Sequence, residues 1–407
     1  MMENLKSPFT LPNGTVLKNR IAKSALSENL ATRKHAPSKS LINTYKTWGQ
    51  GNPGLLMTGN IMIDYKAIGE PRNVVVEDDR DMALLKEWAQ TTKETGVELW
   101  PQINHPGRQA FGKINKEVVA PSAIPVHIKG LKGMFKTPRA LTEEEILDII
   151  KRYGNTAKIM KDAGFTGAQI HGAHGYLVSQ FLSPLSNTRS DKWGGSLENR
   201  SRFAIEVYRS IRQAVGPKFP IGIKINSADF QRGGFTEEES LEVLRILDQE
   251  GIDLLEISGG SYEEPAMMGQ TKKQSTIDRE VYFMDYIKKA RKITAKPLML
   301  TGGFRTVELM ERALAEDHLD IIGLGRPFCL YPHVADDIFN KGLKKIETPT
   351  PLTGIKAIDK IGGLDVIWYE LQIKRIGEGK LPDPDLSGLK AYRQNIWLMV
   401  QKAFAKN

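Results

Sequence analysis

The 407-residue sequence predicts an α/β protein folded as a single (β/α)8 TIM barrel. Eight apolar, strand-like runs alternate along the chain with eight helix-like stretches, and eight such units close a barrel. Several runs are apolar throughout, which is typical of parallel strands covered on both faces. A doubly wound open sheet is the main alternative, but it usually carries a glycine-rich loop after the first strand. Here the first strand ends in Ser24-Ala25-Leu26-Ser27, which contains no glycine.

The elements follow one another in regular order. The predicted strands are Leu17–Leu26, Gly54–Ile63, Val97–Asn104, Thr166–His171, Pro220–Asn226, Leu254–Ser258, Pro297–Thr301 and Ile321–Gly325. The predicted helices are Lys39–Trp48, Met82–Thr95, Glu143–Ala163, Leu197–Val215, Glu237–Glu250, Arg279–Ile293, Val307–Ala315 and Val334–Asn340. Thr142 and Thr236 precede acidic first turns, as helix N-caps do, and glycine follows several helix ends.

Two segments lie outside this alternation. Residues 1–347 are expected to form the barrel, and residues 105–141 form an insert after the third strand that should contain a small hairpin. Residues 348–407 form a proline-containing C-terminal extension, which we expect to pack on the barrel or on a partner subunit of a homo-oligomer. Within it, Ile396–Phe404 is a candidate helix.

Composition excludes several classes of protein. The single cysteine, Cys329, allows no intrachain disulfide and no Cys-rich metal site, and we interpret it as a buried free thiol. The net charge is +9, but basic and acidic residues are interleaved, so we expect attraction of anionic small molecules rather than nucleic acid. No run is long enough to span a membrane, and Met1–Thr10 lacks the apolar core of a signal peptide, so we expect a cytoplasmic protein.

The first candidate site follows the fourth strand. His171 and His174 are three residues apart and could project to one side of a short turn, and Tyr176 lies two residues further on. The two imidazoles can donate hydrogen bonds to a carbonyl or an anion, and the tyrosine can supply a proton. Zinc ligation or simple capping of the strand end would also use such residues. We predict no metal site.

A second candidate site follows the seventh and eighth strands, where barrels usually bind phosphate. Thr301-Gly302-Gly303 and Gly323-Leu324-Gly325-Arg326 offer backbone N–H groups and a guanidinium to an anion. Gln102, late on the third strand, offers an amide with both donor and acceptor. Lys224 lies within an apolar strand and needs a partner, which could be a ligand or an acid in a buried ion pair.

The block around His171 resembles the signature of the Old Yellow Enzyme family of FMN-dependent ene-reductases. It runs from Gly164-Phe165 through His171-Gly172-Ala173-His174-Gly175-Tyr176 and Gln180-Phe181-Leu182-Ser183-Pro184 to Glu198-Asn199-Arg200 and Arg202-Phe203. The resemblance extends from about Leu5 to Gly342. It implies an enzyme in which NADH or NADPH reduces FMN, and the flavin N5 then passes a hydride to an activated alkene.

The resemblance also implies roles for individual residues. His171 and His174 match the pair that binds the activating group of the alkene, and Tyr176 matches the proton donor. The positions that match cofactor contacts are Ser24, Ala25, Ser27, Asn60, Gln102, Lys224, Gly302, Gly303, Gly325 and Arg326. Three positions depart from the family pattern: Lys224 is commonly arginine, Ser27 is often cysteine or threonine, and Asn29 is tyrosine in one subgroup.

Other functions remain as alternatives. Larger relatives of this barrel add Cys-rich iron–sulfur segments and a second flavin domain, for which one cysteine is too few. An FMN-dependent NADH oxidase or dehydrogenase with another acceptor, and a flavin protein without turnover, would use the same cofactor site. A non-redox barrel lyase or isomerase could use the phosphate site for a sugar phosphate, but the block around His171 would then have no explanation.

Overall fold

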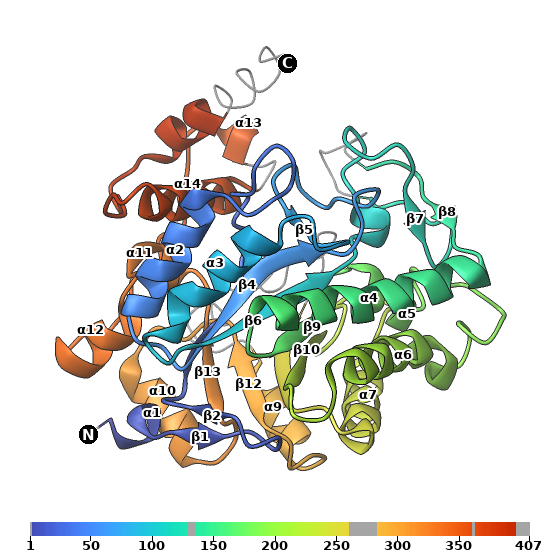
Figure 1. Ribbon diagram of the computed structural model, residues 1–407, viewed down its shortest axis with the longest axis horizontal. Coiled ribbons are helices and arrows are strands. Elements are labelled where there is room, and N and C mark those ends of the chain that lie inside the picture. Colours follow the sequence, from blue (N-terminus) through green and yellow to red (C-terminus); the bar gives the residue numbers. More distant parts are fainter. Residues whose placement is uncertain (1, 128–134, 260–282, 360–362, 396–407) are drawn as a thin grey trace.

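The computed structural model describes residues 2–127, 135–259, 283–359 and 363–395. Within these ranges, eight parallel strands form a closed barrel (Figure 1). The strands are β3 (Ile21–Lys23), β4 (Leu55–Met62), β6 (Glu98–Asn104), β9 (Ala168–Gly172), β10 (Ile221–Asn226), β11 (Leu254–Ser258), β12 (Leu298–Thr301) and β13 (Ile321–Leu324). The barrel closes because β3 pairs with both β13 and β4. The predicted fold class is confirmed.

The first strand differs from its prediction. The expected span Leu17–Leu26 is divided into β2 (Val16–Leu17), which forms an antiparallel hairpin with β1 (Phe9–Thr10), and the three-residue β3. Leu11 and Leu17 of this hairpin join the apolar cluster inside the barrel, which also contains Trp100. The hairpin therefore closes the N-terminal end of the barrel. A Cβ on Gly167 would lie 2.4 Å from the indole of Trp100, so this large interior side chain requires glycine beside it.

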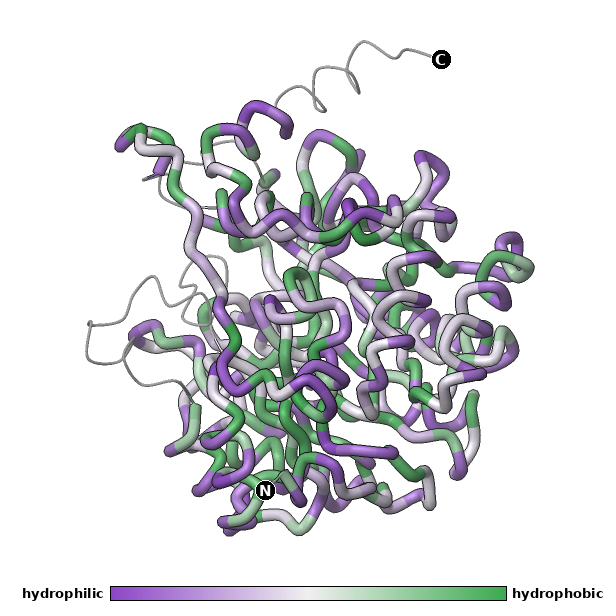
Figure 2. The backbone as a smooth tube through the Cα atoms, turned by 90° about the vertical axis from the view of Figure 1, so that its left-hand side faces the viewer, coloured by the Kyte–Doolittle hydropathy of each residue, from purple (hydrophilic) through white to green (hydrophobic). Residues whose placement is uncertain are grey.

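Helices cover the outside of the barrel. In Figure 2, segments of hydrophobic residues lie between these helices. The outer helices are α2 (Lys39–Gln50), α3 (Met82–Lys93), α4 (Glu143–Ala163), α6 (Leu197–Val215), α7 (Glu237–Glu250), α9 (Met284–Arg291), α10 (Val307–Ala315) and α12 (Val334–Asn340). Thr142 and Thr236 form capping boxes with Glu145 and Glu239, as their positions predicted. The predicted helix Arg279–Ile293 is described only from residue 283 onward.

Two short strands lie in the described part of the insert, and they do not form the expected hairpin with each other. β7 (Val119–Ala120) and β8 (Arg139–Ala140) pair in parallel rather than antiparallel. Strands of two residues leave no alternation from which their direction could be predicted. The remaining short elements are α1 (Glu3–Lys6), β5 (Val74–Val75), η1 (Gly107–Gln109), α5 (Leu177–Leu182) and α11 (Pro327–Leu330).

The C-terminal extension contains α13 (Lys356–Asp359) and α14 (Leu364–Gly377), and α14 packs against α2 and α11 on the barrel (Figure 1). The candidate helix Ile396–Phe404 lies outside the described residues. Cys329 is buried and free, as predicted. No helix in the described part of the chain has both the length and the apolarity needed to cross a membrane.

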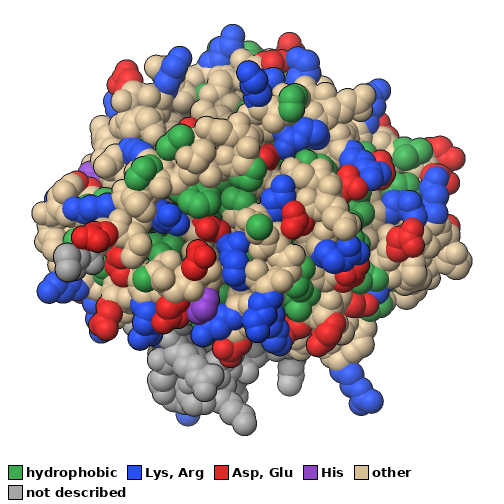
Figure 3. Space-filling view, turned by 90° about the horizontal axis from the view of Figure 1, so that it is seen from below, with side chains coloured by type: hydrophobic (Ala, Val, Ile, Leu, Met, Phe, Trp, Pro, Cys, Tyr) green, Lys and Arg blue, Asp and Glu red, His purple; other side chains and the backbone are tan. Residues whose placement is uncertain are grey.

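The described residues also contain no group of three or more His, Cys, Asp or Glu side chains arranged to hold a metal ion. On the face in Figure 3, Lys and Arg side chains are interspersed with Asp and Glu, so this face carries no extended basic patch.

Candidate active site

Polar side chains replace apolar ones inside the barrel toward the C-terminal ends of the strands. Successive strand residues face opposite sides, so every second residue points inward. The inward-facing positions run Trp100–Gln102–Asn104 on β6, Gly222–Lys224–Asn226 on β10 and Leu254–Glu256–Ser258 on β11. The barrel therefore has an apolar layer, a charged or amide layer above it, and a polar mouth.

The middle layer is a connected network around a buried ion pair. Lys224 and Glu256 are neighbours in the β10–β11 register, and Lys224 Nζ lies 2.9 Å from Glu256 Oε1. Their side chains are 2% and 0% exposed. Gln169 Nε2 donates to Glu256 Oε2 at 2.6 Å, and Gln102 Nε2 donates to Gln169 Oε1 at 2.7 Å. Lys224 was expected to pair with either a ligand or an acid, and the structure provides the acid, Glu256.

The charge balance of this layer follows from its contacts. Burial opposes ionisation of Glu256, but the nearby Lys224 charge and the donors on Thr301 and Gln169 outweigh it, so the pKa of Glu256 lies below its ordinary value. Thr301 Oγ1 donates to Glu256 Oε1 at 2.6 Å, and Ser24 Oγ lies 2.6 Å from Thr301 Oγ1. The pair is therefore ionised at neutral pH and has no net charge.

His171 and His174 meet at the mouth, although not on the short helical turn from which their proximity was predicted. His171 Nε2 lies 3.1 Å from His174 Nδ1. His174 has a φ of 61°, and Asn226 Oδ1 accepts from its backbone N–H at 3.1 Å. This left-handed conformation is uncommon for a residue other than glycine. The turn after β9 thus brings His174 back toward His171 instead of continuing as a helix.

Both imidazoles are neutral at physiological pH. Burial, followed by the charge of Lys224 and, for His171, the neighbouring ring, lowers the pKa of each well below its ordinary value. A neutral imidazole carries one N–H. His171 Nδ1 lies 2.9 Å from Asn60 Oδ1, and His174 Nε2 lies 2.9 Å from Ser258 Oγ. With His171 donating to Asn60, His174 donates to His171 and accepts from Ser258.

Tyr176 lies against this pair. Its ring centroid is 4.6 Å from that of His171, and the residue is 5% exposed. A register shift in β4 between Met57 and Asn60 places Asn60 opposite Gln102, and its Nδ2 lies 3.5 Å from the Tyr176 hydroxyl oxygen. Asn60 therefore contacts the residues predicted for catalysis, although it was predicted as a cofactor contact.

The loops after β12 and β13 have the backbone needed for an anion site. Gly302 and Gly303 have φ values of 126° and 95°, which favour glycine. Arg326 is half-buried with its guanidinium 5.8 Å from the Tyr369 ring, and within the described ranges no carboxylate forms an ion pair with it. Asn104 is fully buried at the mouth, and neither of its amide atoms has a hydrogen-bond partner among the described residues. These features fit an anionic cofactor with polar ring edges.

The segment after β3 holds the remaining predicted positions. Ala25 packs against the interior cluster of the barrel. Ser27 Oγ lies 2.6 Å from Glu70 Oε2 and 2.9 Å from Glu370 Oε1, and Glu370 belongs to α14. A Cβ on Gly325 would lie 3.1 Å from Leu26, so the β13 loop lies close to this segment.

Sequence reasoning missed several residues of the site: Gln169, Glu256, Ser258, Glu70 and Glu370. Three of them had a signal, since they are polar residues at inward-facing positions of otherwise apolar strands. Glu70 and Glu370 had none, because they come from a loop and from the extension.

The sequence matches the profile of the NADH:flavin oxidoreductase / NADH oxidase family over residues 4–345. Among curated relatives, it is 35% identical over 388 residues to the NADH-dependent flavin oxidoreductase nadA of Aspergillus parasiticus, covering 92% of this chain and 85% of that protein. It is 34% identical over 376 residues to the NADH-dependent flavin oxidoreductase iliE of Hypocrea jecorina, covering 84% and 93%.

Solved structures show the same barrel. A 2-naphthoyl-CoA reductase superposes with a TM-score of 0.77 at 27% identity, covering 83% of this chain and 52% of that chain. The old yellow enzyme homologue from Zymomonas mobilis superposes with a TM-score of 0.71 at 24% identity, covering 85% and 95%, and supports the fold.

Proposed function

The chain belongs to the NADH:flavin oxidoreductase / NADH oxidase family, and from this premise we propose that it is an ene-reductase acting on α,β-unsaturated carbonyl compounds or similar activated alkenes. It is an oxidoreductase that acts on small molecules, and its cofactors are FMN and NADH or NADPH. The observation that carries the proposal is the contact of His171, His174 and Tyr176 at one point of the barrel mouth.

The cofactor would be held by two groups of residues. Gly302, Gly303, Gly325 and Arg326 would hold its phosphate, and Ser24, Ala25, Ser27, Gln102 and Lys224 would face its ring system. When bound, FMN supplies the redox chemistry, because it accepts a hydride from the nicotinamide and delivers one to the alkene. The ionised Lys224–Glu256 pair would present the ring with a dipole rather than a free positive charge.

The histidine pair would bind the electron-withdrawing group of the substrate. An oxygen between His171 Nε2 and His174 Nδ1 receives two hydrogen bonds only when both nitrogens carry protons. His171 must then move its proton from Nδ1 to Nε2, and Asn60 must turn its amide nitrogen toward Nδ1. Two such donors stabilise the negative charge that develops on this oxygen during hydride addition.

Tyr176 would protonate the substrate carbon next to the activating group. Its ring contacts His171, so the hydroxyl lies beside the bound substrate oxygen. The tyrosine can therefore act as a general acid while the histidines hold the oxygen.

The test separates the two half-reactions of Tyr176→Phe under anaerobic conditions. Flavin reduction by NADPH or NADH should stay close to the wild-type rate, whereas reoxidation by cyclohexenone should slow by about 10²-fold or more. Tyr153→Phe, a buried tyrosine of α4, is the matched control and should leave both steps unchanged. Equal loss of both half-reactions would exclude the proton-donor role. Wild-type flavin that only oxygen reoxidises would exclude this substrate class.

A further inference from the structure

The C-terminal extension is joined tightly to the barrel beside the predicted cofactor residues. α14 packs against α2 and α11 (Figure 1). At Gly377 the backbone of α14 comes so close to α2 that an added Cβ would lie 2.3 Å from Ser40 Oγ. The helix therefore has a fixed position, and the residues it directs inward are part of the molecule's permanent structure.

Two successive residues of α14 contact two separate cofactor positions. The Tyr369 ring lies 5.8 Å from the Arg326 guanidinium, and Glu370 Oε1 lies 2.9 Å from Ser27 Oγ. Arg326 follows the last barrel strand, whereas Ser27 follows the first. One turn of α14 thus bridges the two loops that border the predicted site.

Tyr369 is itself held in place. It is 5% exposed, its hydroxyl donates to Pro349 O at 2.8 Å, and its ring packs edge-on against Trp368 with centroids 4.9 Å apart. Trp368 Nε1 donates to Leu386 O at 2.7 Å. A guanidinium beside a fixed aromatic ring is attracted to it while its N–H groups remain able to bind a phosphate.

The contact of Glu370 with Ser27 affects the direction in which the Ser27 hydroxyl hydrogen points. The Ser27 hydroxyl has one hydrogen but lies within hydrogen-bonding distance of carboxylate oxygens of both Glu70 and Glu370. The Ser27 hydroxyl can donate to Glu70 Oε2 or to Glu370 Oε1. The Glu370 carboxylate therefore influences the direction of the Ser27 hydroxyl, and without it Glu70 is the remaining acceptor.

We propose that α14 forms the outer wall of the FMN site within the same chain, with Tyr369 positioning Arg326 and Glu370 positioning Ser27. The inference rests on the cofactor roles given to Arg326 and Ser27 above. It makes the extension part of the cofactor site, where the sequence indicated only packing on the barrel or on a partner subunit.

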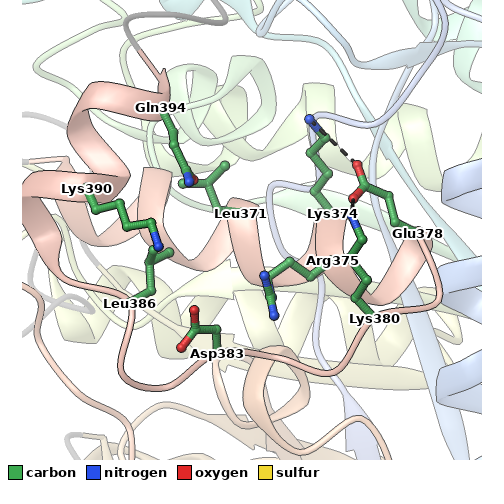
Figure 4. A pocket seen from close by; sticks show the side chains of 9 residues that line it. All are labelled: Leu371, Lys374, Arg375, Glu378, Lys380, Asp383, Leu386, Lys390 and Gln394. Carbon is green, nitrogen blue, oxygen red and sulfur yellow. Dashed lines mark hydrogen bonds and ion pairs between the residues drawn. The ribbon is translucent and has the colours of Figure 1, made fainter.

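The first test measures the affinity of the protein for FMN from the flavin fluorescence of titrations. Tyr369→Ala should weaken binding about threefold to tenfold, the range expected for a partly buried cation–π contact. Tyr369→Phe retains the ring and should bind as the wild type does. Glu378→Ala is the control, because Glu378 lines a cavity of about 280 Å³ on another face of α14 (Figure 4).

Double variants show whether each residue acts through its partner. In an Arg326→Ala background, Tyr369→Ala should cause no further loss of affinity. Glu370→Ala should shift the visible band of bound FMN, and the shift should vanish in a Ser27→Ala background. Wild-type affinity in Tyr369→Ala, or effects that persist without Arg326 and Ser27, would overturn the proposal. If Arg326→Ala itself leaves affinity unchanged, the role of Arg326 in the proposed function fails, and the role of Tyr369 fails with it.

Discussion

The buried ion pair in the barrel allows a quantitative prediction. Lys224 and Glu256 are almost fully buried at 2.9 Å, so removing one partner leaves the other charge without compensation in a poorly solvated layer. Glu256→Gln and Lys224→Met should each destabilise the protein by about 3–5 kcal/mol. The double variant should lie within about 2 kcal/mol of the wild type, because Gln at position 256 keeps an acceptor for its remaining neighbours and no charge stays unpaired.

The assay is urea unfolding followed by tryptophan fluorescence, measured at two FMN concentrations. The stabilisation by a bound ligand grows with its concentration, so the comparison separates the contribution of the pair from that of the cofactor. Because the pKa of Glu256 is depressed, the stability from the pair is present above pH 4.5 and is lost as the pH falls through the lower, folded-state value. Additive effects in the double variant, or single effects below about 1 kcal/mol, would refute the reasoning.

Two further predictions concern histidines, the first His171 with His174 and the second His105. Replacing His171 and His174 together by alanine should weaken the binding of phenol ligands at least about tenfold, because two donors to a charged oxygen are lost, and the charge-transfer absorbance of the complex should disappear; unchanged binding would mean that the pair is structural. His105 has its pKa lowered to about 3, chiefly by burial and then by the charge of Arg152. Because the unfolded chain takes up the proton first, the stability of the wild type relative to His105→Asn should fall by about 1.4 kcal/mol per pH unit below about pH 6.5 and level off near pH 3. Thermal unfolding of both proteins across this pH range measures the change. A stability difference between wild type and His105→Asn that does not vary with pH would contradict the prediction.

The barrel could be predicted because its signal is local and repeated. Each strand and outer helix carries its own apolar pattern and caps, such as Thr142 before α4, and these agree with the final packing. The parallel pairing of β7 and β8 in the insert could not be predicted, because strands of two residues are too short to show a period. The first strand was predicted too long because apolar residues lie on both sides of the polar β2–β3 connection, Lys18–Arg20, which was read as part of one strand.

The residues of the site could be predicted individually, but their pairing could not. Lys224 was recognised as a cation that needs a partner, yet only the β10–β11 register places Glu256 beside it. Asn60 was assigned to the cofactor, but the register shift in β4 places it on His171 and Tyr176. Glu370 lies 343 residues from Ser27, and no local pattern connects the two.

The histidine pair shows why the contacts within the site matter for its chemistry. At 3.1 Å the two facing nitrogens share a single proton, so the pair satisfies itself and offers no second donor to a ligand. Because burial lowers both pKa values, the rings also stay neutral below pH 6.5, where two imidazolium ions would otherwise face each other beside Lys224 and repel. Neutral rings avoid this repulsion and leave one proton that can move between His171 Nδ1 and Nε2. Under the proposed function, a substrate oxygen would gain its second donor only when the Asn60 amide reverses, so binding of the activating group would also set the His171 tautomer.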